Sequence, residues 1–298
     1  MRFASFFMFA AITAAIPAHA QQPRLSVKLD TEAADAVLAI IARGAAASDT
    51  DWQRLFQSEG YRRLKQREAT VKRAFTDSAF RAFVVDTSLA RRAPRLRAAL
   101  EAWKQVDVTA AAQRAFLYLP DSARIRATIY PSIKPRTNTF VFEPSTNPAI
   151  FFYLDPDISA AKFENTLAHE LHHLGVGSVC ANNDAAPRVV QWMGGFSEGR
   201  AVLAAAGNPQ DHPHATSDAA ERAIWDRDYA KVPADMRRLE QFFTDLMNAT
   251  LTDAEQNEQG FAFVATDSVP QGAFYTVGYM MSRAVEMSLG RKRLVESL

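Results

Sequence analysis

The sequence has little cysteine, little excess charge of either sign and, after residue 20, no long apolar run. Cys180 is the single cysteine among 298 residues, which excludes an intramolecular disulfide framework. The 34 basic and 33 acidic residues leave a formal net charge of +1, which argues against a globally basic nucleic-acid-binding protein. With 48% hydrophobic and 22% charged residues, the composition is that of an ordinary globular protein. We therefore expect a folded chain with neither nucleic acid nor a membrane as its partner.

The first twenty residues differ from the rest of the chain. Arg2 precedes an uncharged apolar run over 3–16, and Ala18-His19-Ala20 provides an A-x-A cleavage site. The run is shorter than the roughly 20 apolar residues that cross a bilayer. We therefore predict a signal peptide over 1–20, cleaved after Ala20, and a periplasmic or extracellular protein. Cys180 would be unpaired in that compartment, and we expect it to be buried as a small hydrophobic residue.

Residues 21–120 have the pattern of a helical region. Apolar residues that share one helix face at i, i+4, i+7 and i+8 are Ala33, Val37, Ile40 and Ile41. We expect breaks between successive helices at Ser88 and Pro94. No motif in this region indicates chemistry, so we interpret it as a helical amino-terminal layer.

Residues 121–298 begin with strand-like alternation and continue with helices. Three segments are predicted to be strands, and they cover 123–129, 139–142 and 149–154. We expect them to form a small, largely antiparallel sheet. A long amphipathic helix is predicted over 274–289, ended by Gly290. The predicted fold class is α+β: a mostly helical domain with a small sheet over 121–298, joined to the helical layer over 21–120.

The motif that indicates chemistry is His169-Glu170-Leu171-His172-His173, which is H-E-x-x-H. On a helix, His169 and His173 lie about 40° apart on one face and one turn apart. Two imidazoles placed in this way can bind one tetrahedral zinc ion. Glu170 is about 100° away from His169 around the helix and can reach a metal-bound water as a general base. His172 is expected to support the site or lie at the surface rather than bind metal.

The residues around the motif favour a helix with one buried side. We expect Asp157 to cap its start and Gly175 to take the left-handed position after its end. An apolar stripe on the side opposite the two histidines consists of Phe163, Leu167, Leu171 and Leu174. The histidines should therefore face a cleft.

A catalytic zinc ion takes three protein ligands and leaves one position for water. Val176 and Val179 occupy the positions where the metzincin pattern requires glycine and histidine, so that class is excluded. We predict Glu198 as the third ligand, 25 residues after His173, at the start of a helix that Ser197 can cap. Asp184 is the alternative third ligand.

The segment H-E-L-H-H at 169–173, followed by S-E-G-R-A at 197–201, resembles the gluzincin metallopeptidases. In that class a glutamate on a second helix completes the zinc site, and the closest likeness is to bacterial zinc-dependent protease families of unknown substrate. The segment from Tyr275 to Gly278 is similar to the Y-x-x-G helix of aminopeptidase N-like enzymes. The resemblance implies that Tyr275 stabilises the oxyanion, with Tyr279 as its rival. The G-x-M-E-N segment of those aminopeptidases is missing, and Val202 replaces an acidic residue of thermolysin-like enzymes.

These observations predict a secreted zinc peptidase with one zinc ion per chain and a peptide or protein substrate. The strand over 149–154 is expected to be a sheet edge that holds an extended substrate. His212 and His214 are expected to be solvated loop residues. Two alternatives stay open: a secreted binding protein on a degenerate peptidase scaffold, and a zinc hydrolase that acts on a bond other than a peptide.

Overall fold

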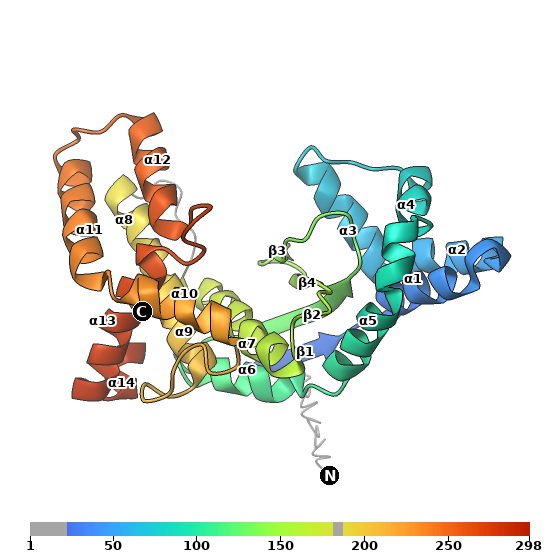
Figure 1. Cartoon of the computed structure of the whole chain (residues 1–298). Coiled ribbons are helices and arrows are strands. Elements are labelled where there is room, and N and C mark those ends of the chain that lie inside the picture. The colour runs from blue at the N-terminus through green and yellow to red at the C-terminus, as the bar shows by residue number, and fades with distance from the viewer. Residues whose placement is uncertain (1–22, 181–186) are drawn as a thin grey trace, which may run out of the picture.

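The structure, a computed structural model, describes residues 23–180 and 187–298. The predicted signal peptide and the alternative ligand Asp184 lie outside the described residues. Within the described part, no helix combines the length and the apolar character needed to cross a bilayer. Figure 1 shows the helices over residues 32–104 on one side of a small sheet. The helices over residues 188–295 lie on the other side, beyond the helix over 160–177.

Four strands form a mixed sheet in the order β1-β2-β4-β3. The strands are β1 (Leu25–Leu29), β2 (Ile125–Ser132), β3 (Phe140–Phe142) and β4 (Ala149–Tyr153). The pairs β1–β2 and β2–β4 are parallel, and only β3–β4 is antiparallel. The expectation of a largely antiparallel sheet is therefore wrong. The reason is β1, which comes from the region expected to be only helical and pairs in parallel with β2 across 100 residues, Leu25 opposite Ile125.

The expectation that β4 forms a sheet edge is also wrong. β4 lies between β2 and β3, so backbone partners occupy both of its sides. All five of its residues are buried, as expected for an inner strand covered on both faces. The edges of the sheet are β1 and β3.

Seven helical segments separate β1 from β2. They are α1 (Glu32–Arg43), η1 (Gly44–Ala46), α2 (Asp49–Gln57), α3 (Glu59–Thr70), α4 (Asp77–Val84), α5 (Thr87–Lys104) and α6 (Val108–Phe116). The chain breaks between α4 and α5 at Val85 and Asp86, close to the break expected at Ser88, and Asp86 caps α5. The break expected at Pro94 does not occur, because Pro94 lies inside α5. Leu89 and Leu96 are buried on one face of α5, and this packing holds the helix together around Pro94.

The carboxyl-terminal half is helical. Its segments are α7 (Ala160–Gly177), α8 (Arg188–Met193), η2 (Gly194–Phe196), α9 (Ser197–Ala206), α10 (Ala219–Tyr229), α11 (Val232–Met247), α12 (Asp253–Val264), α13 (Ala273–Leu289) and α14 (Arg291–Val295). The predicted end of α13 at Gly290 is confirmed, with a positive φ of 84° at this glycine. A mostly helical chain with a small sheet confirms the α+β class.

The main hydrophobic core includes residues from both sides of residue 120 and holds α7 in place. Phe163 stacks on Trp103 of α5 with ring centroids 4.2 Å apart. Leu167 and Leu171 are completely buried in the same core, and Leu174 is nearly so, which confirms the predicted apolar stripe. The other face of α7 is thereby directed away from the core, where it carries His169 and His173.

Both predicted ends of α7 need correction. Ser159, and not Asp157, caps the helix by accepting the backbone N–H of Lys162 at 3.1 Å. Gly175 lies inside the helix, which continues to Gly177. A Cβ atom at Gly175 would stand 2.1 Å from Cδ1 of Leu119, so glycine is needed there for close packing rather than for a left-handed turn.

Cys180 lies just beyond α7 and is exposed, so the expectation of a buried thiol is wrong. The helix has already ended at Ser178, and the neighbouring Val179 is the residue that packs against the core.

Candidate metal centre

Three predicted ligands come together on α7 and α9. Nε2 of His169 lies 3.0 Å from Nε2 of His173, and each of these nitrogens lies 3.1 Å from Oε2 of Glu198. Among the described residues, these three side chains form a group whose ligand atoms lie close enough together to bind one metal ion. Two helices therefore direct three ligand atoms at one point.

The distances fit a tetrahedral ion. Zinc bonds to nitrogen and oxygen are about 2.0–2.1 Å long, so tetrahedral ligand atoms stand about 3.3–3.4 Å apart. The observed separations of 3.0–3.1 Å are a few tenths of an ångström shorter. Two imidazole nitrogens and one carboxylate oxygen that converge in this way bring lone pairs together, which a cation would stabilise. Imidazole and carboxylate ligands are also typical of catalytic zinc sites.

The protein environment keeps Glu198 charged. Burial alone would raise the pKa of its carboxyl group, but the hydrogen bonds from His169 and His173 and their charges hold that pKa well below its usual range. Burial opposes protonation of His173, yet the contact with Glu198 raises the pKa of this imidazole above its ordinary value. The carboxylate and the imidazoles stabilise each other, which favours an anionic ligand beside two nitrogen ligands.

Close contact between α9 and α13 positions Glu198. A Cβ atom at Gly199 would stand 2.0 Å from the backbone nitrogen of Tyr279, and one at Gly278 would stand 2.8 Å from the carbonyl oxygen of Phe196. The two helices thus meet through their backbones, which only glycine allows. Ser197 does not cap α9 as expected, because η2 leads directly into the helix and Phe196 occupies the cap position.

Glu170 and Tyr275 line a cavity of about 260 Å³ beside the ligand cluster, together with His169. The ring of Tyr275 lies parallel to that of His169, with an interplanar angle of 7° and centroids 6.1 Å apart. Burial and the negative charges of Glu198 and Glu170 raise the pKa of the Tyr275 hydroxyl, which therefore keeps its proton at neutral pH. Glu170 is half-buried.

Tyr279, the predicted rival of Tyr275, lies elsewhere. Its ring is buried against Trp225 and Tyr229, at centroid distances of 5.6 and 5.9 Å. Its hydroxyl donates a long hydrogen bond of 3.5 Å to the carbonyl oxygen of Asp211. Of the two tyrosines, Tyr275 is the one that reaches the cavity beside His169.

His214 was expected to be solvated, but it is buried and lines the same cavity as Glu170. Its ring packs on Trp225, and burial together with the charge of Lys162 lowers the pKa of His214 to about 4. A neutral imidazole therefore faces the cavity. His212 is half-buried rather than fully solvated, and its Nε2 lies 2.9 Å from Oδ1 of Asp226.

His172 is completely buried and does not join the ligand cluster. Burial and the neighbouring His173 and His169 hold the pKa of its imidazole well below the ordinary value. It therefore lies in the interior behind the two candidate ligands, and the surface position that the sequence left open is wrong.

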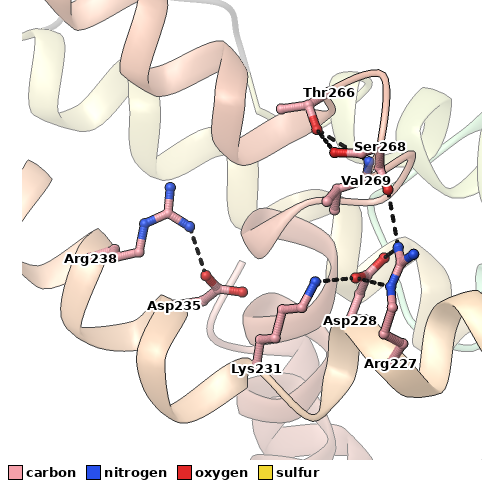
Figure 2. A network of polar contacts seen from close by, with 8 residues as sticks. All are labelled: Arg227, Asp228, Lys231, Asp235, Arg238, Thr266, Ser268 and Val269. Carbon is pink, nitrogen blue, oxygen red and sulfur yellow. Dashed lines mark hydrogen bonds and ion pairs between the residues drawn. The ribbon is translucent and has the colours of Figure 1, made fainter.

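A network of polar contacts holds the segment that precedes α13 and borders the cavity beside Glu170. Figure 2 shows Asp228 between Arg227 and Lys231, with Arg227 also donating to the carbonyl oxygen of Ser268 at 3.0 Å. Thr266 and Val269 close a tight turn on each other. Pro270 and Gln271 follow this turn and line the cavity beside Glu170. The network thus fixes one wall of the cavity.

A second cavity of about 660 Å³ is lined in part by His173. Its lining includes Met193, Met281 and Val285, with Arg200 as a cationic group. Two cavities therefore adjoin the ligand cluster, a polar one beside Glu170 and a largely apolar one beside His173.

The fold and the site together define an α+β protein with a His/His/Glu group of metal-ligand geometry. A family model described as "putative zinc dependent peptidase (DUF5700)" matches residues 52–298, and the chain belongs to this family. No curated protein and no solved structure matches the chain.

Proposed function

We propose that the protein is an exported zinc peptidase that hydrolyses peptide bonds. The observation that carries this proposal is the convergence of His169, His173 and Glu198 on one point beside Glu170. Membership in a family described as zinc-dependent peptidases supports the metal and the reaction class. The pattern over residues 1–20 supports export to the periplasm or the cell exterior.

The chain's own residues supply the remaining chemistry. Zinc held by His169, His173 and Glu198 would lower the pKa of a water molecule to about 7 and polarise the scissile carbonyl. Glu170 would accept the proton of that water and later deliver it to the leaving amine. Within the described residues no hydrogen bond or ion pair holds the Glu170 carboxylate, so it is available for this role.

Tyr275 would stabilise the developing oxyanion. Its hydroxyl keeps its proton because its pKa is raised, so it can donate a hydrogen bond at neutral pH. A single donor of this kind contributes roughly 3 kcal/mol to transition-state stabilisation in other enzymes. The two cavities that adjoin the ligand cluster would give space for parts of a peptide substrate.

Zinc per chain, measured by elemental analysis of the mature protein beside a His169→Ala variant, tests the metal site. We expect about one zinc ion in the parent and almost none in the variant. Cleavage of a broad peptide library by the zinc-loaded parent then tests the reaction. A protein that binds no zinc after reconstitution would favour the binding-protein alternative. A zinc-loaded protein that cleaves no peptide would leave the binding protein or a hydrolase of another bond.

A further inference from the structure

A separate cavity of about 410 Å³ lies among the amino-terminal helices, between the end of α3, the start of α4 and the loop after β2. Its volume lies within the range of small-molecule sites. Its lining includes none of the residues of the candidate metal centre. This cavity is therefore separate from the candidate metal centre.

Apolar side chains make one wall of this cavity. Leu64 and Phe80 are buried there, and Phe75 stacks on Phe80 with centroids 5.6 Å apart. Such a wall can accommodate an aliphatic chain or an aromatic ring.

Cationic side chains also contribute to the wall of this cavity. Four basic residues line it, and they are Lys72, Arg73, Lys134 and Arg136. The one acidic residue in the lining is Glu68, whose Oε1 already lies 2.6 Å from Nη1 of Arg67. Across the described ranges, the side chains of Lys72, Arg73 and Arg136 have no ion-pair or hydrogen-bond partner. These three residues are exposed, and the lining has four basic residues against the single carboxylate of Glu68. The cavity thus has an excess of positive charge.

Lys134 is the buried member of this cationic wall, with 5% of its surface exposed. Its ammonium group donates to the carbonyl oxygens of Arg136 and Asn138 at 2.5 and 2.6 Å, and to Oδ1 of Asn138 at 2.9 Å. All three acceptors are neutral. Burial lowers the pKa of Lys134 to about 8 although the negative charge of Glu68 opposes this shift. No carboxylate accepts a hydrogen bond from Lys134 among the described residues, so a bound anion would stabilise its charged form.

We infer that this cavity binds a small amphipathic anion, a carboxylate attached to an aliphatic chain or aromatic ring. The apolar part would pack on Leu64, Phe75 and Phe80, and the carboxylate would lie between Arg73 and Arg136. Arginine is suited to this because its planar guanidinium binds carboxylates through two parallel hydrogen bonds. This inference does not depend on the peptidase activity.

Octanoate is the probe, and isothermal titration calorimetry on the full mature chain measures its binding. We expect saturable binding with one octanoate per chain, and at least tenfold weaker binding of acetate and of 1-octanol. Equal binding of octanoate and 1-octanol, or of octanoate and acetate, would overturn the inference, as would the absence of saturable binding.

Variants locate the site. Arg73→Ala with Arg136→Ala should weaken octanoate binding at least tenfold, and Ala79→Trp, at an exposed position in the lining, should fill the cavity and abolish binding. Arg62→Ala with Arg91→Ala removes the same charge at exposed positions outside the cavity and should leave binding unchanged. Equal weakening by both pairs would show a general charge effect and overturn the assignment.

The metal centre could also bind the carboxylate of the probe, so it needs a control. His169→Ala should bind octanoate as the parent does, because the cavity lies apart from the ligand cluster. Loss of octanoate binding in His169→Ala would place the carboxylate at the metal and overturn the inference, without bearing on whether the protein is a peptidase.

Discussion

The helices that carry the candidate metal centre and the amino-terminal helices are held together in different ways. α9 and α13 meet through backbone atoms, because Gly199 and Gly278 have no side chain between the two helices. Helices α2 to α4 meet through aromatic rings instead, such as Tyr61 and Phe80 with centroids 5.0 Å apart. A backbone contact fixes the distance between helices to within tenths of an ångström, whereas packed rings can adjust when one of them changes.

The difference has a functional meaning. Ligand atoms must lie within a few tenths of an ångström of the geometry that the metal requires. Glu198 directly precedes Gly199, so the helix contact sets the position of the carboxylate. The two regions should therefore respond differently to substitution. Changes at the glycine contact should alter both stability and metal content, and changes among the amino-terminal rings should alter stability alone.

The largest expected effect belongs to the metal-site region. Glu170→Gln should lower kcat/KM for a cleaved peptide by roughly 10²–10⁴-fold, because the proposed general base is lost, while zinc per chain stays the same. Glu164→Gln removes the same charge from the same helix, outside the cavity, and should keep nearly full activity. Peptide hydrolysis kinetics with elemental analysis measure both. Full activity of zinc-loaded Glu170→Gln would contradict the proposed mechanism.

Gly199→Ala tests the backbone contact. The added methyl group would stand 2.0 Å from the backbone nitrogen of Tyr279, so α9 and α13 must separate. We expect a loss of roughly 3 kcal/mol in the free energy of unfolding and a lower zinc content of the folded protein. Gly194→Ala, where the backbone is helical and an added Cβ meets no atom within 4 Å, should keep the zinc content and should not destabilise the protein. Denaturant unfolding and zinc analysis measure both quantities. Equal stability and equal zinc content of the two variants would show that the backbone contact does not position the ligand.

Tyr275→Phe removes one hydroxyl beside the ligand cluster. We expect kcat to fall roughly 10²-fold with KM and stability almost unchanged, because the proposed hydrogen bond to the oxyanion would form mainly in the transition state. Tyr279→Phe removes the hydroxyl that donates a 3.5 Å hydrogen bond to Asp211 outside the cavity, and it should retain activity. If Tyr279→Phe were the slower enzyme, the roles of the two tyrosines would have to be exchanged.

Phe80→Leu tests the amino-terminal helices in the same comparison. Phe80 is buried against Tyr61 and Phe75, so its replacement should cost about 1–2 kcal/mol in the free energy of unfolding. Zinc per folded chain should not change, because the affected helices do not touch the ligand cluster. Val85→Ala, at a position that is 62% exposed, is the neutral control. Zinc loss in folded Phe80→Leu would show that the two regions are coupled.

The sequence predicted local features well and non-local ones poorly. His169, Glu170 and His173 share one helix, so their spacing alone predicts a common face. Glu198 could be predicted because its segment has the features of a helix start. The mixed sheet was missed because β1 pairs with β2 across 100 residues, and no local periodicity records that pairing. The burial of His214 was missed for the same reason, because it depends on contact with Trp225 from another element.

The polar network in Figure 2 should have the smallest effect, because a third kind of contact, between charges, holds the turn that precedes α13. The side chain of Asp228 is 5% exposed, but Arg227 and Lys231 are about half exposed. Asp228→Asn should therefore cost about 1 kcal/mol or less at pH 7. Asp235→Asn, which removes the neighbouring carboxylate bound only to Arg238 in this network, is the matched variant and should cost less.

The effect of Asp228 should depend on pH. Burial opposes ionisation, but the contacts with Arg227 and Lys231 lower the pKa of the Asp228 carboxyl group. A carboxyl group whose pKa is lower in the folded protein contributes its stability above the unfolded value of about 3.9, and loses it as the pH falls through the folded value. Thermal unfolding at pH 7, 5 and 3 should thus show a difference in Tm between parent and Asp228→Asn that is constant from pH 7 to pH 5 and shrinks toward pH 3. A difference that stays constant down to pH 3 would mean that the ion pairs do not stabilise the turn, and that packing alone holds it.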